Sequence, residues 1–112
     1  MRELRAELES LGHEVITPFS AERQIPRKYW DDLKLANLER FAEEKGSTAK
    51  MYFDKIKEGD AILVFNPDKN GVKNYIGANT LMEIAIAFDL GRKVFVMHNL
   101  PDSNFHDELV MV

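Results

Sequence analysis

The apolar run at residues 61–65, between Asp60 and Asn66, restricts the fold more than any other segment. A second run of this kind, residues 94–97, lies between Lys93 and His98. Strands that are apolar on both faces are typical of a parallel sheet covered by helices, because a strand with one face in water alternates apolar and polar residues. The sequence therefore predicts two buried parallel strands, at residues 60–66 and 93–98.

The segment between these strands contains a helix that is apolar nearly all round. From residue 81 to residue 90 only Glu83 and Asp89 are polar, and Gly91 ends the helix. Such a helix belongs in a protein interior. Because strand, helix and strand alternate, we expect an α/β fold: a flavodoxin-like or Rossmann-like three-layer sandwich with a short parallel sheet, complete or incomplete.

The N-terminal half is predicted to be mostly helical. Leu4, Leu8 and Leu11 recur at helical spacing, and Gly12 ends that helix. The other expected elements are a strand at residues 13–18, a loop at 19–27, a helix at 29–44 ended by Gly46, a helix at 47–57 capped by Ser47, polar loops at 67–76 and 99–104, and a last helix from residue 105.

Composition narrows the classes of function. The 112 residues are enough for one domain, spanning 1–112, and the net charge of −4 argues against binding a nucleic acid polymer, which needs clustered Lys and Arg. The absence of cysteine excludes disulfides and thiolate chemistry. Neither a signal peptide nor a membrane-spanning run is present, so we expect a cytoplasmic protein that does not bind membranes. No glycine-rich phosphate motif and no metal-ligand spacing occurs, so no cofactor or metal is expected.

A binding site is expected where the strands end, because ligands of open parallel sheets bind at the carboxyl ends of the strands. Asn66 and Asp68 follow the first buried strand and could approach a sugar or a base; alternatively, Asn-Pro-Asp only opens a turn. His98 and Asn99 end the other strand, and His98 is more readily explained as a structural residue. The helix that carries Glu83 is expected to begin at the same edge.

Glu83 has two interpretations. Thr80 and Glu83 have the spacing of a capping box, in which Thr80 caps the helix and the Glu83 side chain bonds back to it. Alternatively Asn79 caps the helix, and Glu83, in the first turn, points into a pocket. Apolar neighbours would then strip water from its carboxylate and make it a better nucleophile while opposing its ionisation.

The chain resembles the nucleoside 2-deoxyribosyltransferase-like family. The resemblance covers most of the chain, including residues 8–18, 60–65 and 90–94, and its specific part is Thr80 followed three residues later by Glu83. Residues 74–80 are similar to an uncharacterised branch of bacterial and archaeal relatives. The resemblance implies that Glu83 is the nucleophile that attacks the anomeric carbon of a deoxynucleoside or its 5′-monophosphate, and that another base or water then takes the sugar.

The same resemblance implies further site residues and some departures. Gly77, Asn79 and Thr80 would line the substrate site together with Asn66 and Asp68. Gly77 stands where the transferases have an aspartate, and Asn79 where they have glycine. Relatives also begin with a strand before the first helix and continue beyond the last one. A sheet without that strand leaves backbone groups unpaired, so we expect a homo-oligomer.

Overall fold

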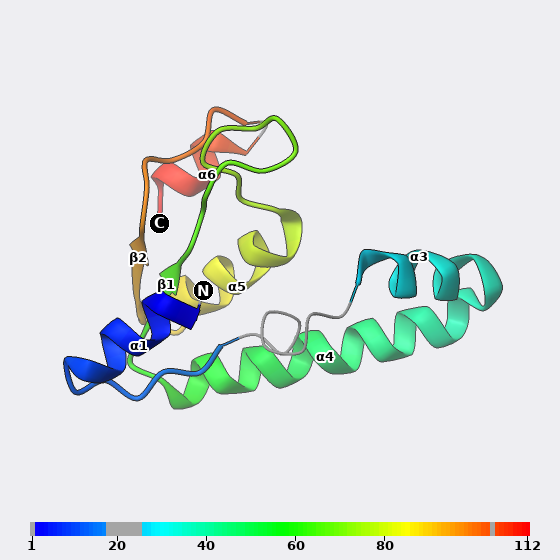
Figure 1. The fold of residues 1–112 in the computed structure, drawn as a ribbon, viewed down its shortest axis with the longest axis horizontal. Coiled ribbons are helices and arrows are strands. Elements are labelled where there is room, and N and C mark those ends of the chain that lie inside the picture. Colours follow the sequence, from blue (N-terminus) through cyan, green and yellow to red (C-terminus); the bar gives the residue numbers. More distant parts are fainter. Residues whose placement is uncertain (1, 18–25, 104) are drawn as a thin grey trace. The chain divides into compact units, whose positions relative to one another are not determined.

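The computed structural model describes residues 2–17, 26–103 and 105–112, which contain helices and a short parallel sheet. The chain divides into two compact units, Met1–Lys50 and Met51–Val112, and the boundary falls inside helix α4. Figure 1 shows the elements of both units. Their bounds are α1 (Arg2–Ser10), α3 (Arg27–Ala36), α4 (Leu38–Glu58), β1 (Ala61–Val64), α5 (Ala78–Asp89), β2 (Lys93–Val96) and α6 (His106–Val110).

Strands β1 and β2 are parallel neighbours, as the two apolar runs predict. Ala61 lies opposite Lys93, and Val64 lies opposite Val96. Both strands are shorter than expected. Just beyond them the Met97 amide donates to the Val64 carbonyl (2.9 Å), and the His98 amide donates to the side-chain oxygen of Asn66 (3.0 Å).

The core of the second unit lies between the sheet and the apolar helix α5. One face of each strand packs against a buried cluster to which α5, the loop before it and α6 contribute (Figure 1). Burial of large aliphatic side chains contributes about 1.5–3 kcal/mol each, so this cluster is what holds α5 on the strands. Its buried members are Val64, Ile76, Ile84 and Leu109, and Ile62, Leu81, Val94, Val96, Leu100 and Phe105 pack around them.

The observed fold class is mixed α/β with a two-stranded parallel sheet in the described residues. This agrees with the predicted class at the coarse level. The face of the sheet opposite the core carries Phe95, which is 53% exposed. The three-layer sandwich therefore stays a prediction.

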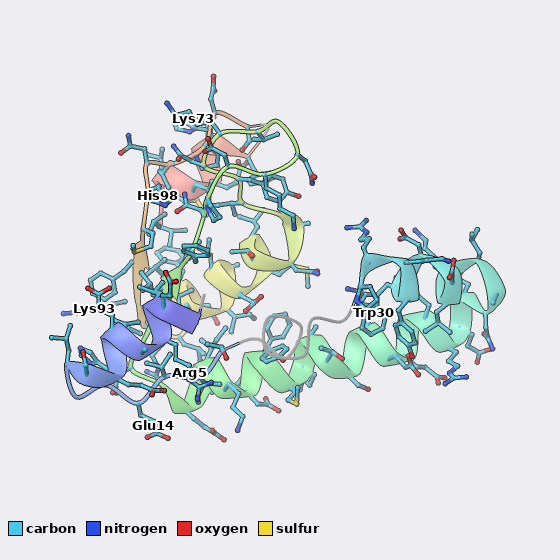
Figure 2. The ribbon with its side chains drawn as sticks, viewed as in Figure 1. Arg5, Glu14, Trp30, Lys73, Lys93 and His98 are labelled. Carbon is cyan, nitrogen blue, oxygen red and sulfur yellow. The ribbon has the colours of Figure 1, made fainter. Side chains whose placement is uncertain are left out.

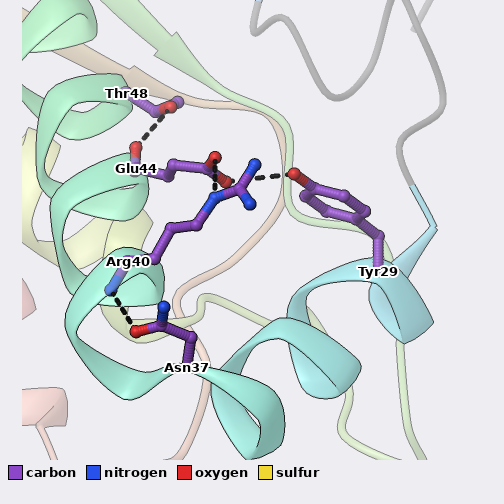
Figure 3. A network of polar contacts seen from close by, with 5 residues as sticks. All are labelled: Tyr29, Asn37, Arg40, Glu44 and Thr48. Carbon is purple, nitrogen blue, oxygen red and sulfur yellow. Dashed lines mark hydrogen bonds and ion pairs between the residues drawn. The ribbon is translucent and has the colours of Figure 1, made fainter.

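The N-terminal helices break at a different place from the one expected. The predicted helix at 29–44 is two helices, because Asn37 stops α3 and starts α4. Its backbone is extended (φ −157°), its amide donates to the Leu33 carbonyl (2.8 Å), and its Oδ1 accepts from the Arg40 amide (3.1 Å). Figure 3 shows this cap beside Glu44, which accepts hydrogen bonds from Arg40 and Tyr29. One asparagine thus serves both helix ends.

The predicted break at Gly46 and the predicted cap at Ser47 are wrong, because α4 continues through both. A single glycine inside a helix costs only about 1 kcal/mol relative to alanine, which a long helix tolerates. The neighbouring Thr48 hydroxyl donates to the Glu44 carbonyl (2.9 Å) within the helix and caps nothing (Figure 3). Glycine was therefore a weaker stop signal here than the side chain of Asn37.

The strand expected at residues 13–18 is also wrong over its described part. Residues 13–17 form no strand, and Pro18, like the first residues of the loop expected at 19–27, lies outside the described residues. The segment leaves α1 through Gly12 (φ 94°), after which the His13 amide bonds back to the Leu8 carbonyl (3.2 Å). A strand needs a neighbour for its backbone groups, and the ladder seen in the described residues joins β1 to β2 alone.

The predicted stop at Gly91 is confirmed. Gly91 has φ 70°, its amide donates to Phe88 (3.1 Å), and the Arg92 amide donates to Ala87 (2.8 Å). These two bonds form a Schellman motif, which satisfies the last carbonyls of α5. The Arg92 guanidinium also donates to the Lys57 carbonyl at the end of α4 (2.9 Å), so one residue serves two helix ends within the second unit.

We expect the two glycines to respond in opposite ways to alanine. Gly91→Ala places a side chain at positive φ and should lower the free energy of unfolding by about 1 kcal/mol, although no atom obstructs the new methyl group. Gly46→Ala, inside α4, should raise it by about 1 kcal/mol. Urea denaturation followed by circular dichroism measures both; equal effects of the two substitutions would contradict this account of the helix ends.

Candidate functional site

The loops that follow β1 and β2 lie at the same end of the second unit, where the carboxyl ends of the parallel strands meet (Figure 1). Lys73, on the first of these loops, and His98, on the second, are both at this end and both exposed (Figure 2). This edge is where the topology of a parallel sheet favours a ligand. The residues that the sequence singled out come from the loop after β1 and from helix α5.

Asn66 joins the two loops. Its side chain is 0% exposed, and both ends of its amide are bonded. The amide nitrogen donates to the Asn99 carbonyl (3.0 Å) and, at longer range, to the Asn74 carbonyl (3.4 Å), while Oδ1 accepts from the His98 amide. Direct contact with a ligand would require some of these bonds to break. Asn66 therefore fixes the two loops relative to each other.

Asp68 fixes the shape of the loop after β1. Its Oδ1 accepts from the Asn74 amide (2.9 Å), and the backbone groups of Lys69 and Val72 bond to each other across a two-residue turn. Asp68 as a whole is exposed. Asn74 thus connects the two predicted residues, since its carbonyl bonds Asn66 and its amide bonds Asp68.

Helix α5 begins earlier than expected. Gly77, in an extended conformation, occupies the N-cap position without any side-chain cap, and the Leu81 amide bonds to its carbonyl (3.0 Å). Thr80 is therefore the third helical residue, so the capping-box interpretation of Thr80 and Glu83 is wrong. The alternative cap at Asn79 is wrong as well. Glycine is among the residues that are favourable at the N-cap, even though it has no side chain to bond the free amides of the first turn.

Tyr75 is a residue of this region that the sequence did not single out. Its ring lies against Gly77, so closely that a Cβ on Gly77 would be 3.2 Å from the tyrosine hydroxyl. The Nζ atom of Lys69 lies over the same ring, 5.8 Å from its centroid. The only signal was an aromatic residue two positions before a glycine that starts a helix, which is too common a pattern to predict a contact.

Glu83 lies in the second turn of α5, not in the first turn as expected. It is half-buried, and the described residues provide it with no hydrogen bond or ion pair. Burial among apolar groups raises the pKa of its carboxyl group above the ordinary value, since desolvation disfavours the charged form. The helix dipole gives little compensation, because its effect is confined to the first turn.

The structure thus distributes the predicted site residues over two groups. Asn66 and Asp68 belong to the hydrogen-bonded loop after β1, whereas Gly77, Asn79, Thr80 and Glu83 follow one another along the start of α5. Asn79 is exposed and Thr80 is half-buried. No cluster of metal-ligating side chains occurs within residues 2–17, 26–103 and 105–112. The arrangement provides a half-buried acid on α5, with Asn79 and Thr80 four and three residues before it on the same helix.

Removing the Asn66 amide should destabilise the second unit strongly. Asn66→Ala leaves the His98 amide and the carbonyls of Asn74 and Asn99 without their partner, so we expect the free energy of unfolding to fall by about 3 kcal/mol. Asn79→Ala, an exposed asparagine on α5, is the control and should change it by less than about 0.5 kcal/mol. Urea titration of both variants compares them; similar small effects would show that the Asn66 bonds contribute little.

The raised pKa of Glu83 predicts a dependence of stability on pH. A carboxyl group whose folded pKa lies above its unfolded pKa stabilises the protein fully below the unfolded value, and this contribution disappears as pH rises through the folded value. Glu83→Gln removes it. We therefore expect the stability of Glu83→Gln relative to the native chain to increase from acid to neutral pH in urea titrations. Parallel pH profiles would show that the group ionises without penalty.

Comparison with family models, with curated proteins and with solved structures finds no match for this chain. Within the part of the chain that the structure describes, no helix is both long and apolar enough to cross a membrane. Among the described residues, the half-buried carboxylate of Glu83 is the group that points most directly to a function.

Proposed function

We propose that this chain acts on the N-glycosidic bond of a deoxynucleoside or its 5′-monophosphate, with Glu83 as the nucleophile. The observation that carries the proposal is the half-buried Glu83 carboxylate, which has a raised pKa and no polar partner among the described residues. A carboxylate that served only as a helix cap would be bonded to the first turn of its helix. The resemblance of Thr80 and Glu83 to the transferase pattern supports the same assignment.

The proposed reaction has two steps. A carboxylate oxygen of Glu83 forms a bond to the anomeric carbon, and the bond from that carbon to the base nitrogen breaks with its electron pair leaving on the base, which takes up a proton. A second base, or water, then attacks the anomeric carbon and frees the carboxylate. Poor hydration makes Glu83 more nucleophilic in its ionised form, which is the form that must react.

The other residues are assigned supporting roles. Asp68, Asn79 and Thr80 have polar groups that could bind the hydroxyls of the sugar or the edge of the base, and Gly77, against which the ring of Tyr75 packs, starts the helix that carries Glu83. Asn66 acts indirectly, by holding the loops after both strands. The cytoplasmic location and the homo-oligomer expected from the sequence stay predictions.

A second candidate function is a module that binds a nucleoside or nucleotide without reacting with it, or an inactive fragment of this fold. The observation that favours it is Gly77, at the position where the transferases have an aspartate. Without that carboxylate a ligand would be bound but less well oriented for attack. The two candidates differ in whether free base is released.

Glu83→Gln distinguishes them. Deoxynucleosides and their 5′-monophosphates are incubated with the native chain, with and without a second base, and free and exchanged bases are measured by chromatography. We expect the native chain to release base and Glu83→Gln to do so more than about a hundredfold more slowly, with unchanged ligand affinity by calorimetry. Asp89→Asn, on the same helix but exposed, is the control and should keep full activity.

Three results would count against the reaction. Binding without base release by the native chain would favour the non-catalytic module. Equal activity of the native chain and Glu83→Gln would remove Glu83 from the mechanism. If the native chain neither binds nor cleaves any of these compounds, both candidate functions are wrong.

A further inference from the structure

The turn at residues 69–72 has an unusual local chemistry. Asn70 (φ 54°) and Gly71 (φ 74°) both have positive φ, and Lys69 and Val72 exchange two backbone hydrogen bonds across them (3.0 and 2.9 Å). These are the features of a type I′ turn, for which Asn-Gly is the preferred sequence. Both central residues are exposed, and no atom lies within 4 Å of where a Cβ on Gly71 would be.

Asn-Gly brings an amide carbon next to an unobstructed backbone nitrogen. The Gly71 nitrogen can approach the Cγ of Asn70, since glycine has no side chain to block a close backbone approach. In the described residues, neither the Asn70 side chain nor the Gly71 amide makes a hydrogen bond that would hold it away. The two bonds between Lys69 and Val72 are the ones that span Asn70 and Gly71 directly, so a local opening of these bonds is enough to bring the reacting atoms together.

We propose that Asn70 is a site of spontaneous deamidation, which converts it to aspartate and isoaspartate. The Gly71 nitrogen, after losing its proton, forms a bond to Cγ of Asn70, and the bond from Cγ to Nδ2 breaks, so that ammonia leaves and a cyclic imide remains. Water then opens the imide at either carbonyl. One amide and one water molecule thus become one carboxylate and ammonia, without any cofactor. The positive charges of Lys69 and Lys73, on either side of the turn, favour the anionic nitrogen.

Two other asparagines of the same loop region, Asn74 and Asn66, serve as internal comparisons for Asn70. Asn74 has the same φ of 54°, but it is half-buried and the nitrogen that would attack belongs to Tyr75, which donates to the Pro67 carbonyl (3.2 Å). Asn66 is followed by a proline and therefore has no backbone N–H that could react. The reaction should therefore be selective for Asn70, even though all three asparagines lie within one loop region.

The product would alter the loop beside the candidate site. Isoaspartate adds one carbon to the backbone between residues 70 and 71, so the two bonds that join Lys69 to Val72 no longer fit together. The reaction also adds one negative charge to a chain with a net charge of −4. Neither effect depends on the proposed glycosyl transfer, so this inference stands or falls independently of it.

The test uses the full chain, kept folded at mildly alkaline pH and physiological temperature. Anion exchange separates the more acidic form, peptide mass mapping locates it, and an isoaspartyl methyltransferase with labelled S-adenosylmethionine detects isoaspartate. We expect Asn70 to react about tenfold faster than Asn74 or more, which corresponds to a difference in barrier of about 1.4 kcal/mol. Gly71→Ala should abolish most of the reaction, and Asn70→Asp, which already has the charge of the product, should form no further acidic species at this turn.

Three outcomes would overturn the proposal. One is an acidic form whose modification maps to another asparagine. Another is an unchanged rate in Gly71→Ala, provided that circular dichroism shows the variant to be folded. The third is a native chain that stays unmodified while the same chain in urea reacts at Asn70, because the folded turn would then protect the residue.

Discussion

A fully buried amide, that of Asn66, joins the segments that follow both strands. Its hydrogen bonds to Asn99, His98 and Asn74 lie just beyond the ends of β1 and β2. Buried polar groups must be satisfied, so this one residue fixes the conformation of two loops that are far apart in the sequence. Asp68 is linked to this connection through Asn74, whose amide donates to it and whose carbonyl bonds Asn66.

The second constraint is the burial of Glu83 without compensation. Most buried charges in proteins are paired, and an isolated one shifts its pKa toward the neutral form. Burial raises the pKa of Glu83, and no hydrogen bond or ion pair joins its carboxyl group to another described residue. A group held in this way is a candidate for chemistry, because perturbed carboxyl groups are concentrated at functional sites. This is why the proposed function centres on Glu83 and not on the better-connected Asn66 or Asp68.

The candidate site illustrates what a linear pattern can miss. Glu83 stands out in the sequence because apolar residues surround it, and its partial burial agrees with that pattern. The capping-box interpretation is wrong, because Thr80 and Glu83 have the right spacing but the N-cap of the helix is Gly77. The packing of Tyr75 against Gly77 could not be predicted from the sequence. A contact between an aromatic ring in a loop and the first residues of a helix depends on how the loop folds back.

The sequence by itself determined the parallel pair of strands, the apolar helix between them and the helix end at Gly91, because each follows from local hydrophobic pattern or from backbone conformational preference. The break at Asn37 is also local, because its bonds reach only to Leu33 and Arg40, but hydrophobic periodicity does not reveal it. The tertiary structure alone decided that residues 13–17 stay outside the sheet and that the Asn66 side chain bonds His98 and Asn99. These features depend on which distant backbone groups meet, and periodicity along the chain carries no information about such meetings.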